Sequence, residues 1–262
     1  MSEAAFDRVV ERVVELDAGY TPPDFAHVPD PDAALFLCAV DHKAGYQRPH
    51  QVGSQGPFEG SELMWAVALA AGRPLRASAL AAVTAAEVAE CFRIEDETVA
   101  GPGRRAELWR DLAAELTGSY GGAAASLLAA ADGRLAGPGG LLGRLAAFRA
   151  YDDPLAKKAQ LLAKICERRG WFEVADPESW EVSADSVLMR LALRAGLVER
   201  GALAEVRAAT RAEFKRVARA ASIPPPRLDD LLWEIGRSDP DLLGNQAGDL
   251  REPPRDPASS WY

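Results

Sequence analysis

A lysine at the start of a predicted helix is the first residue whose position suggests chemistry. Asp153-Pro154 predicts a helix start, because an aspartate caps free backbone N–H groups and proline fits the first turn, and this helix should run to about Arg169. Lys157 would lie in the first turn, where the helix dipole disfavours a positive charge and slightly lowers the pKa of the amine. A lowered pKa suits a nucleophilic amine, whereas an exposed, solvated lysine is the alternative interpretation.

The same helix carries a basic stripe. Lys157, Lys164 and Arg168 are seven and then four residues apart, a spacing that places them on one side of a helix. The opposite side is apolar and carries Leu155, Leu162 and Cys166. The surrounding stretch, residues 143–171, has seven Lys and Arg against three acids in a chain of net charge -9. This favours a small anionic ligand over a long nucleic-acid track, with a solvated helix face as the alternative.

An aspartate before the next predicted helix is a candidate catalytic carboxylate. Asp185, in Ser183-Ala-Asp185, opens a helix expected over residues 184–195, where free N–H groups and the helix dipole should keep it ionised. A fixed, ionised carboxylate in a dry pocket stabilises an oxocarbenium-like transition state and can polarise the attacking water. A plain N-cap with no catalytic role is the competing interpretation.

Further pocket candidates lie near a long irregular segment, residues 42–59, whose composition is typical of loops that line sites. Asp41 is a candidate acceptor for the N–H donors of a guanine-like edge. Asp229 and Trp233 share a helix face, with Trp233 expected in the core and Asp229 expected to orient a neighbour. Aromatic side chains beside the irregular segment are candidates for stacking on a base, although each also suits a core or scaffold role: Phe36, Tyr46, Phe58 and Trp65.

Helical periodicity dominates the chain, so we predict an all-α fold. Thr84-Ala-Ala-Glu87 is a capping box, and residues 171–174 are the one short strand candidate. We expect a single domain over residues 1–237, with an N-terminal helical part (33–100) and a catalytic part (101–237). An irregular tail, residues 238–262, should follow, with Trp261-Tyr262 folded back onto the body. The expected helices span residues 3–16, 33–40, 61–71, 102–116, 153–169, 184–195, 203–220 and 225–236.

Several function classes lack their motifs, including nucleotide-binding glycine loops, zinc-protease helices and serine-hydrolase elbows. The acidic, amphipathic N-terminus and the short apolar runs predict a cytoplasmic protein with no membrane partner. We expect neither a metal nor an organic cofactor, because no metal-ligand spacing links the three histidines, His27, His42 and His50. Three distant cysteines predict reduced, mostly buried thiols: Cys38, Cys91 and Cys166.

Three motifs follow one another in a recognisable order. They are Leu155-Ala-Lys-Lys-Ala-Gln-Leu-Leu162, Ser183-Ala-Asp185 and Leu228-Asp-Asp-Leu-Leu-Trp233. Together they resemble the helix-hairpin-helix glycosylase superfamily, over roughly residues 86–237. The resemblance implies a helix-hairpin-helix, DNA-glycosylase-like fold and cleavage of an N-glycosidic bond, with Asp185 as the catalytic carboxylate.

Two branches of that superfamily compete. Residues 185–197 and 223–237 resemble the archaeal 8-oxoguanine DNA glycosylases. This resemblance implies that Lys157 attacks the sugar of lesion-containing DNA and forms a Schiff base. Three features resemble the queuosine salvage family: residues 157–162, the spacing from Asp176 to Asp185, and Tyr120-Gly-Gly followed by a helix over 141–148. This second branch implies a small nucleotide or nucleoside as substrate, with Lys157 holding phosphate or sugar. Lys164 is then a further binding candidate.

The hairpin before Lys157 departs from the superfamily. A DNA-binding hairpin uses glycines so that backbone N–H groups can approach a phosphate. Here Ala150-Tyr-Asp-Asp-Pro-Leu-Ala156 has no glycine and places two acids at that point. We therefore favour a small nucleotide or nucleoside over DNA. The DNA glycosylase and lyase is the alternative. A third hypothesis is a non-catalytic ligand-binding module, for which Asp185→Asn would leave ligand affinity unchanged.

Overall fold

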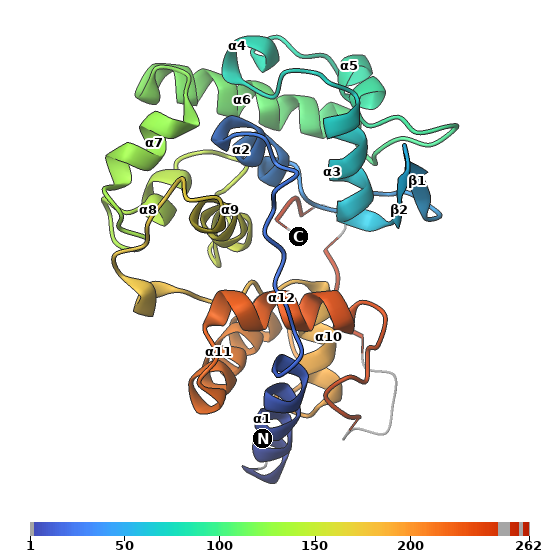
Figure 1. The fold of residues 1–262 in the computed structure, drawn as a ribbon, viewed down its shortest axis with the longest axis vertical. Helices are drawn as coiled ribbons and strands as arrows, with labels where there is room; N and C mark the ends of the chain where they lie inside the picture. The colour runs from blue at the N-terminus through green and yellow to red at the C-terminus, as the bar shows by residue number, and fades with distance from the viewer. Residues whose placement is uncertain (1–2, 246–251, 257–258, 262) are drawn as a thin grey trace.

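The computed structural model describes residues 3–245, 252–256 and 259–261 and confirms the predicted all-α class (Figure 1). Its two short strands are β1 (His50–Val52) and β2 (Gln55–Phe58), and a 3-10 turn spans Pro177–Ser179. The α-helices of the described residues are α1 (Glu3–Asp17), α2 (Pro31–Ala39), α3 (Gly60–Ala70), α4 (Ala77–Leu80), α5 (Ala85–Cys91), α6 (Pro102–Tyr120), α7 (Ala124–Ala131), α8 (Leu141–Leu145), α9 (Lys157–Arg168), α10 (Ser186–Arg194), α11 (Leu203–Ala221) and α12 (Pro225–Gly236).

Buried apolar side chains form two separate clusters, which define two lobes. The upper lobe of Figure 1, residues 25–180, holds the cluster built around helices α2 to α9. The lower lobe, residues 3–20 and 181–245, holds the cluster between α1, α10, α11 and α12. The chain therefore crosses the waist between the lobes at least twice, after α1 and again before α10. No helix within the described residues is both long and apolar enough to cross a bilayer.

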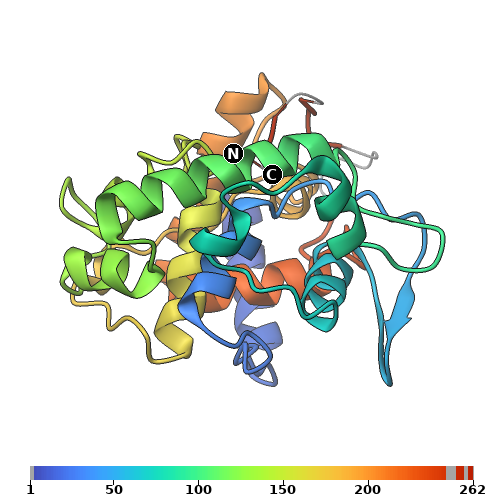
Figure 2. The same ribbon diagram turned by 90° about the horizontal axis from the view of Figure 1, so that it is seen from above.

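Helix α2 lies at the centre of the upper lobe. Its residues 33–39 are all buried, because they are apolar or small on every side, and the helix packs against α6, α7 and α9 (Figure 2). Asp30 caps its start by accepting a hydrogen bond from the backbone N–H of Ala33 at 2.8 Å. The helix ends at Ala39, so its rigid C-terminus positions the next residues, Asp41 and His42, at the waist.

The strand prediction was wrong in both respects. The segment over residues 171–174 is irregular, because Trp171 and Phe172 both donate their backbone N–H to the carbonyl of Cys166 and so complete the end of α9. The strands β1 and β2 instead form an antiparallel hairpin within the segment predicted as a loop. This hairpin packs against α3, and α3 in turn supplies one wall of the central cavity.

The three cysteines are free and buried, as predicted. Burial raises the pKa of Cys91 to about 11 and that of Cys166 to about 12, and it also raises the pKa of Cys38. All three side chains therefore stay protonated near neutral pH and pack as small apolar groups.

Candidate active site

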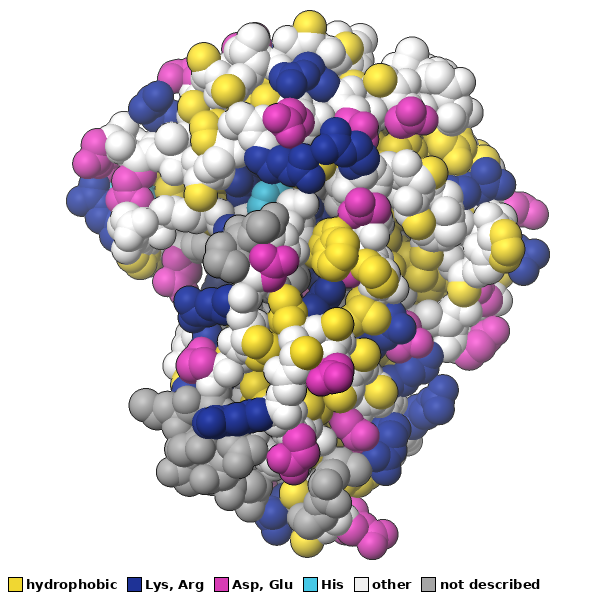
Figure 3. Space-filling view, turned by 180° about the vertical axis from the view of Figure 1, so that it is seen from behind, with side chains coloured by type: hydrophobic (Ala, Val, Ile, Leu, Met, Phe, Trp, Pro, Cys, Tyr) yellow, Lys and Arg dark blue, Asp and Glu magenta, His cyan; other side chains and the backbone are white. Residues whose placement is uncertain are grey.

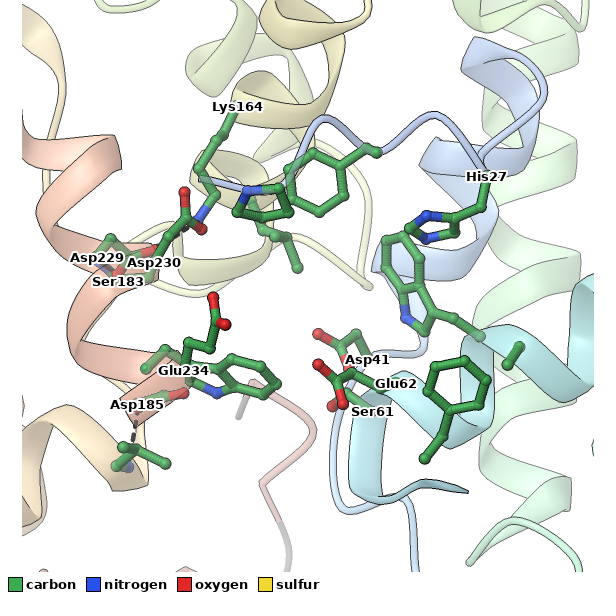
Figure 4. A pocket seen from close by; sticks show the side chains of 18 of the residues that line it. His27, Asp41, Ser61, Glu62, Lys164, Ser183, Asp185, Asp229, Asp230 and Glu234 are labelled. Carbon is green, nitrogen blue, oxygen red and sulfur yellow. Dashed lines mark hydrogen bonds and ion pairs between the residues drawn. The ribbon is translucent and has the colours of Figure 1, made fainter. Parts of the chain in front are cut away.

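A cavity of about 940 Å³ lies between the two lobes, at the upper end of the range usual for ligand pockets. Both lobes contribute to it, as Figure 4 shows. The upper-lobe side chains His27, Asp41, Ser61 and Glu62 face lower-lobe side chains across the open space. The facing lower-lobe residues are Ser183, Asp185, Asp229, Asp230 and Glu234. A ligand in this cavity would therefore contact both lobes at once.

Lys157 lines the cavity as the first residue of α9. The predicted helix start at Asp153-Pro154 is three residues too early. The chain turns after Pro154, and Ala156 adopts a left-handed backbone conformation with a φ of 52°. Asp153 nevertheless acts as the cap, because its carboxylate accepts hydrogen bonds from the N–H groups of Leu155 (3.1 Å) and Lys157 (3.0 Å). This cap holds Lys157 at the cavity.

The prediction that the helix start lowers the pKa of Lys157 is wrong. Burial does lower it, but the carboxylates of Asp41 and Asp185 outweigh burial and raise the pKa of Lys157 above its usual value. Its Nζ lies 3.3 Å from Oδ2 of Asp41. Burial raises the pKa of Asp41, but Lys157 and the nearby Ser61 hydroxyl lower it by more. The pKa of Asp41 therefore lies below its usual value. The two groups form a buried ion pair.

Asp185 caps α10, as predicted. Its Oδ1 accepts hydrogen bonds from the backbone N–H groups of Val187 (2.9 Å) and Leu188 (3.0 Å). Among the described residues no hydrogen bond reaches its Oδ2, which is left to the cavity. Burial raises the pKa of Asp185 above its usual value, although Lys157 and the cap bonds oppose this shift. The expectation that the cap alone keeps Asp185 ionised therefore understated the effect of burial.

Lys164 joins the lobes. From α9 its Nζ reaches Oδ2 of Asp229 at 2.7 Å and Oδ1 of Asp230 at 2.5 Å, both on α12. Arg168, one turn further along the predicted stripe, donates to the remaining oxygen of Asp230. Asp229 also accepts from the N–H of Ser183 at 2.8 Å, which orients the segment leading to Asp185. Lys164 lines the cavity, but its charge is already matched by two carboxylates, so it offers no open anion site.

Lys158 and His42 form a buried pair that sequence reasoning missed. Nζ of Lys158 donates to the carbonyl of Ala39 at 2.6 Å and lies 3.3 Å from Nδ1 of His42. Burial and the neighbouring Lys157 lower the pKa of Lys158 to about 7, while burial and Lys158 lower the pKa of His42. The available signal was the spacing of Lys158 from Leu162 and Ile165, which puts it on the apolar side of α9.

The aromatic candidates divide into two groups. Phe58, Trp65 and Trp233 line the cavity. Phe36 and Tyr46 do not line the cavity, and the alternative core or scaffold role applies to them: Phe36 is fully buried in the upper-lobe core, and the Tyr46 hydroxyl donates to the carbonyl of Phe92 at 2.7 Å. His27 also lines the cavity, although no sequence pattern predicted this position. Trp233 was expected in the core but is only half-buried.

The charge of the lining is mainly negative. Among the described lining residues, seven carboxylates face three lysines. The carboxylates are Asp24, Asp41, Glu62, Asp185, Asp229, Asp230 and Glu234, and the lysines are Lys43, Lys157 and Lys164. Such a lining favours a ligand with N–H donors or a positive charge and disfavours a phosphate. The small anionic ligand inferred from the basic stretch is therefore a poor match, because the stripe lysines serve to neutralise carboxylates.

Two buried polar atoms in the cavity wall lack a hydrogen-bond partner within the described structure. One is Oδ1 of Asp41, an acceptor, and the other is Nε1 of Trp65, a donor. A buried polar atom without a partner costs about 1–3 kcal/mol, so native proteins usually satisfy it with a bound molecule or water. Hydrogen bonding is therefore incomplete in this part of the cavity wall.

The hairpin between α8 and α9 has its acids in two different states. Asp153 is buried and forms a two-pronged ion pair with Arg207, at 2.9 and 2.8 Å. Asp152 is exposed and accepts a hydrogen bond from the indole of Trp261 at 2.7 Å. The prediction that Trp261 folds back onto the body is confirmed, while Tyr262 lies outside the described residues. Repulsion of DNA by two acids is thus an oversimplification, because Arg207 neutralises one of them.

Comparisons with known proteins place the chain only loosely. No family model matches it, and no curated protein matches its sequence. Among solved structures, it is similar to an 8-oxoguanine DNA glycosylase from Pyrobaculum aerophilum in complex with 8-oxoguanosine. The two share 15% sequence identity with a TM-score of 0.49, over 90% of this chain and 89% of that chain. A likeness at this level assigns neither family nor function, so the cavity has to carry the functional argument.

Proposed function

We propose that this protein is a hydrolytic N-glycosylase that releases the base from a small nucleoside. The observation that carries the proposal is the state of Asp185. Two backbone N–H groups fix one of its oxygens, and the other is left to a cavity shared by both lobes. A carboxylate held in this way is preorganised to stabilise positive charge that develops on a sugar.

The reaction breaks the bond between the sugar C1′ and the base nitrogen. The electron pair of that bond leaves with the base, the sugar becomes oxocarbenium-like, and Asp185 stabilises its positive charge. Water then adds its oxygen to C1′, and its proton ends on the departing base. Asp185 directs this water. Lys157, whose charge Asp41 balances, donates hydrogen bonds to the sugar hydroxyls and does not act as a nucleophile.

The base is recognised by Asp41 and Trp65 in this proposal. Oδ1 of Asp41 accepts an N–H of the base, and Nε1 of Trp65 donates to an adjacent acceptor, which is the pattern of a guanine-like edge. The surplus of carboxylates also suits an amine on the base. A modified deazapurine of the queuosine type offers both features, and we propose that class as the substrate. The same surplus favours the nucleoside over the nucleotide, because a phosphate would add negative charge.

An 8-oxoguanine DNA glycosylase with lyase activity is the second candidate. It is favoured by the presence of a lysine, Lys157, and an aspartate, Asp185, in one cavity. A lyase needs the neutral amine as its nucleophile, and the raised pKa of Lys157 holds the amine protonated near neutral pH. The two candidates therefore differ in the charge state of one residue.

A substrate panel tests the proposal. The wild-type protein would be offered queuosine, its 5′-monophosphate and a duplex containing 8-oxoguanine, with base release followed by mass spectrometry and borohydride added in parallel. We expect release from queuosine, slower release from the monophosphate and no trapped protein–DNA adduct. Release from the duplex with a trapped adduct that disappears in Lys157→Ala would establish the second candidate instead.

A further inference from the structure

The described C-terminal residues 252–256 and 259–261, termed here the strap, lie in the waist and contact both lobes (Figure 1). On the lower lobe, the carboxylate of Glu252 accepts hydrogen bonds from Arg190 (3.1 Å) and Arg194 (2.9 Å) of α10. On the upper lobe, Nζ of Lys43 donates to the carbonyls of Asp256 and Ser259, both at 2.7 Å. Because Lys43 also lines the cavity, the strap crosses at its rim.

Trp261 anchors the end of the strap to the hairpin before α9. Its indole N–H donates to Asp152 at 2.7 Å, and its ring lies 6.0 Å from the guanidinium of Arg207. Arg207 in turn holds Asp153, whose carboxylate caps α9 at Lys157. The end of the strap thus contacts the hairpin that positions Lys157.

The hairpin itself offers few donors to a nucleic-acid phosphate. A hairpin binds phosphate through backbone N–H groups that point outward. Here the N–H groups of Leu155 and Lys157 donate to the Asp153 carboxylate, and that of Ala156 donates to the Asp153 carbonyl at 2.8 Å. A polynucleotide would have to bind by charge alone at this point.

The cations beside the waist are engaged by the strap. Seen from behind, Lys and Arg side chains lie both above and below the waist (Figure 3). Three cations, Lys43, Arg190 and Arg194, donate hydrogen bonds to a carboxylate or to carbonyls of the strap. Without the strap these three cations would lose those contacts, while Arg194 keeps its ion pair with Asp241, and a phosphate backbone could take the place of the strap.

We propose that the strap is a specificity element that keeps polynucleotides off the waist and restricts the cavity to small substrates. This inference rests on the proposed function for the identity of the small substrate, but not for the exclusion of polynucleotide. The segment supplies no group to the reaction. It acts by occupying cations and contacting the hairpin.

The test measures binding of a fluorescent single-stranded and a fluorescent duplex oligonucleotide by anisotropy. It compares the full chain, a deletion of residues 252–262, and Trp261→Ala. Trp171→Ala is the matched control, because it removes another half-buried indole beneath a guanidinium, that of Arg169 at 5.1 Å, away from the strap. Thermal melting checks that each variant is folded.

We expect the deletion to bind oligonucleotide at least about tenfold more tightly than the full chain, with an affinity that falls as salt rises. Trp261→Ala should give a smaller gain, and Trp171→Ala none. Equal binding by the full chain and the deletion, in folded protein, would overturn the inference. Because the readout is binding, it is independent of catalysis. An absence of base release from every nucleoside would contradict the proposed function and leave this result intact.

Discussion

The two ends of the interlobe cavity each contain a lysine and two aspartates, but the hydrogen bonding of the two ends differs. At the clamp end, formed by Lys164, Arg168, Asp229 and Asp230, the side-chain oxygens of both aspartates accept hydrogen bonds from neighbouring groups. At the proposed reactive end, formed by Asp41, Trp65, Lys157 and Asp185, Asp41 and Trp65 each keep a buried polar atom without a partner in the described structure.

This difference distinguishes the residues that hold the lobes together from those proposed to bind the substrate. Saturated ion pairs between α9 and α12 hold the lobes in register and have no capacity left for a ligand. The partner-less atoms carry a free-energy cost that a ligand can remove. Hydrogen-bond satisfaction, and not residue type, therefore distinguishes the binding part of the cavity from its scaffold.

The largest expected effect falls on the clamp end. Lys164→Met should lower the free energy of unfolding by about 3–5 kcal/mol, because the buried Asp229 loses its cation and Asp230 keeps only Arg168. Chemical denaturation measures this loss. Arg104→Met, which breaks the exposed pair with Glu107, is the matched control and should cost less than about 1 kcal/mol. Similar values for both variants would show that the clamp does not hold the lobes.

Asp41→Asn, at the proposed reactive end, should lower stability less than Lys164→Met does but should weaken substrate recognition more. Asp41→Asn keeps the side-chain size but replaces a carboxylate that pairs with Lys157 and that, in the proposed function, accepts a hydrogen bond from the base. We expect kcat/KM for base release to fall about 10- to 100-fold, equivalent to about 1.4–3 kcal/mol. An unchanged kcat/KM would place base recognition elsewhere in the cavity.

The buried Lys158 should make stability depend on pH. Its folded pKa of about 7 lies below the usual value for lysine, so between about pH 7 and pH 10 the unfolded state binds more protons. Stability contributed by this group therefore rises with pH in that window, on the order of 1.4 kcal/mol per pH unit. Denaturation across the window, compared with Lys158→Met, isolates this dependence. A constant difference between the two proteins would contradict the assignment.

The smallest expected effect is a shift of the acidic side of the pH–rate profile to higher pH, caused by Asp185. Asp185 must be ionised to stabilise the sugar cation, and burial raises its pKa. Activity should therefore fall on acidification at a pH above the usual aspartate value of about 3.9. The rate of base release across the acidic range measures this shift. A rate that stays constant down to about pH 4 would show that Asp185 is not the group that titrates.

Local sequence signals predicted much of this site, because caps and helical spacing depend on few residues. The caps at Asp185 and Thr84 follow from short motifs, and both are present. The spacing of Lys157 and Lys164 likewise placed both on the cavity side of α9. In each case the backbone alone determines where the side chain points.

The remainder depends on how distant segments pack. The ion pairs of Lys157 with Asp41 and of Lys164 with α12 join residues far apart in the chain, and they reversed the predicted pKa shift of Lys157. Phe36 is an aromatic residue of the kind that stacks on bases, but it lies in the apolar stretch 33–39 of α2, which the fold buries completely. Spacing along one segment contains no information on these contacts.

The most direct test of the account is the single-turnover rate of queuine release from queuosine by the wild type and Asp185→Asn. Asparagine caps a helix as well as aspartate does, so α10 and the melting temperature should be preserved while the charge is lost. Asp30→Asn, the same change at the cap of α2, is the matched control. We predict a loss on the order of 10³-fold for Asp185→Asn and none for Asp30→Asn. A rate within threefold of wild type for Asp185→Asn (roughly 0.7 kcal/mol) would contradict the central claim that Asp185 is the catalytic carboxylate.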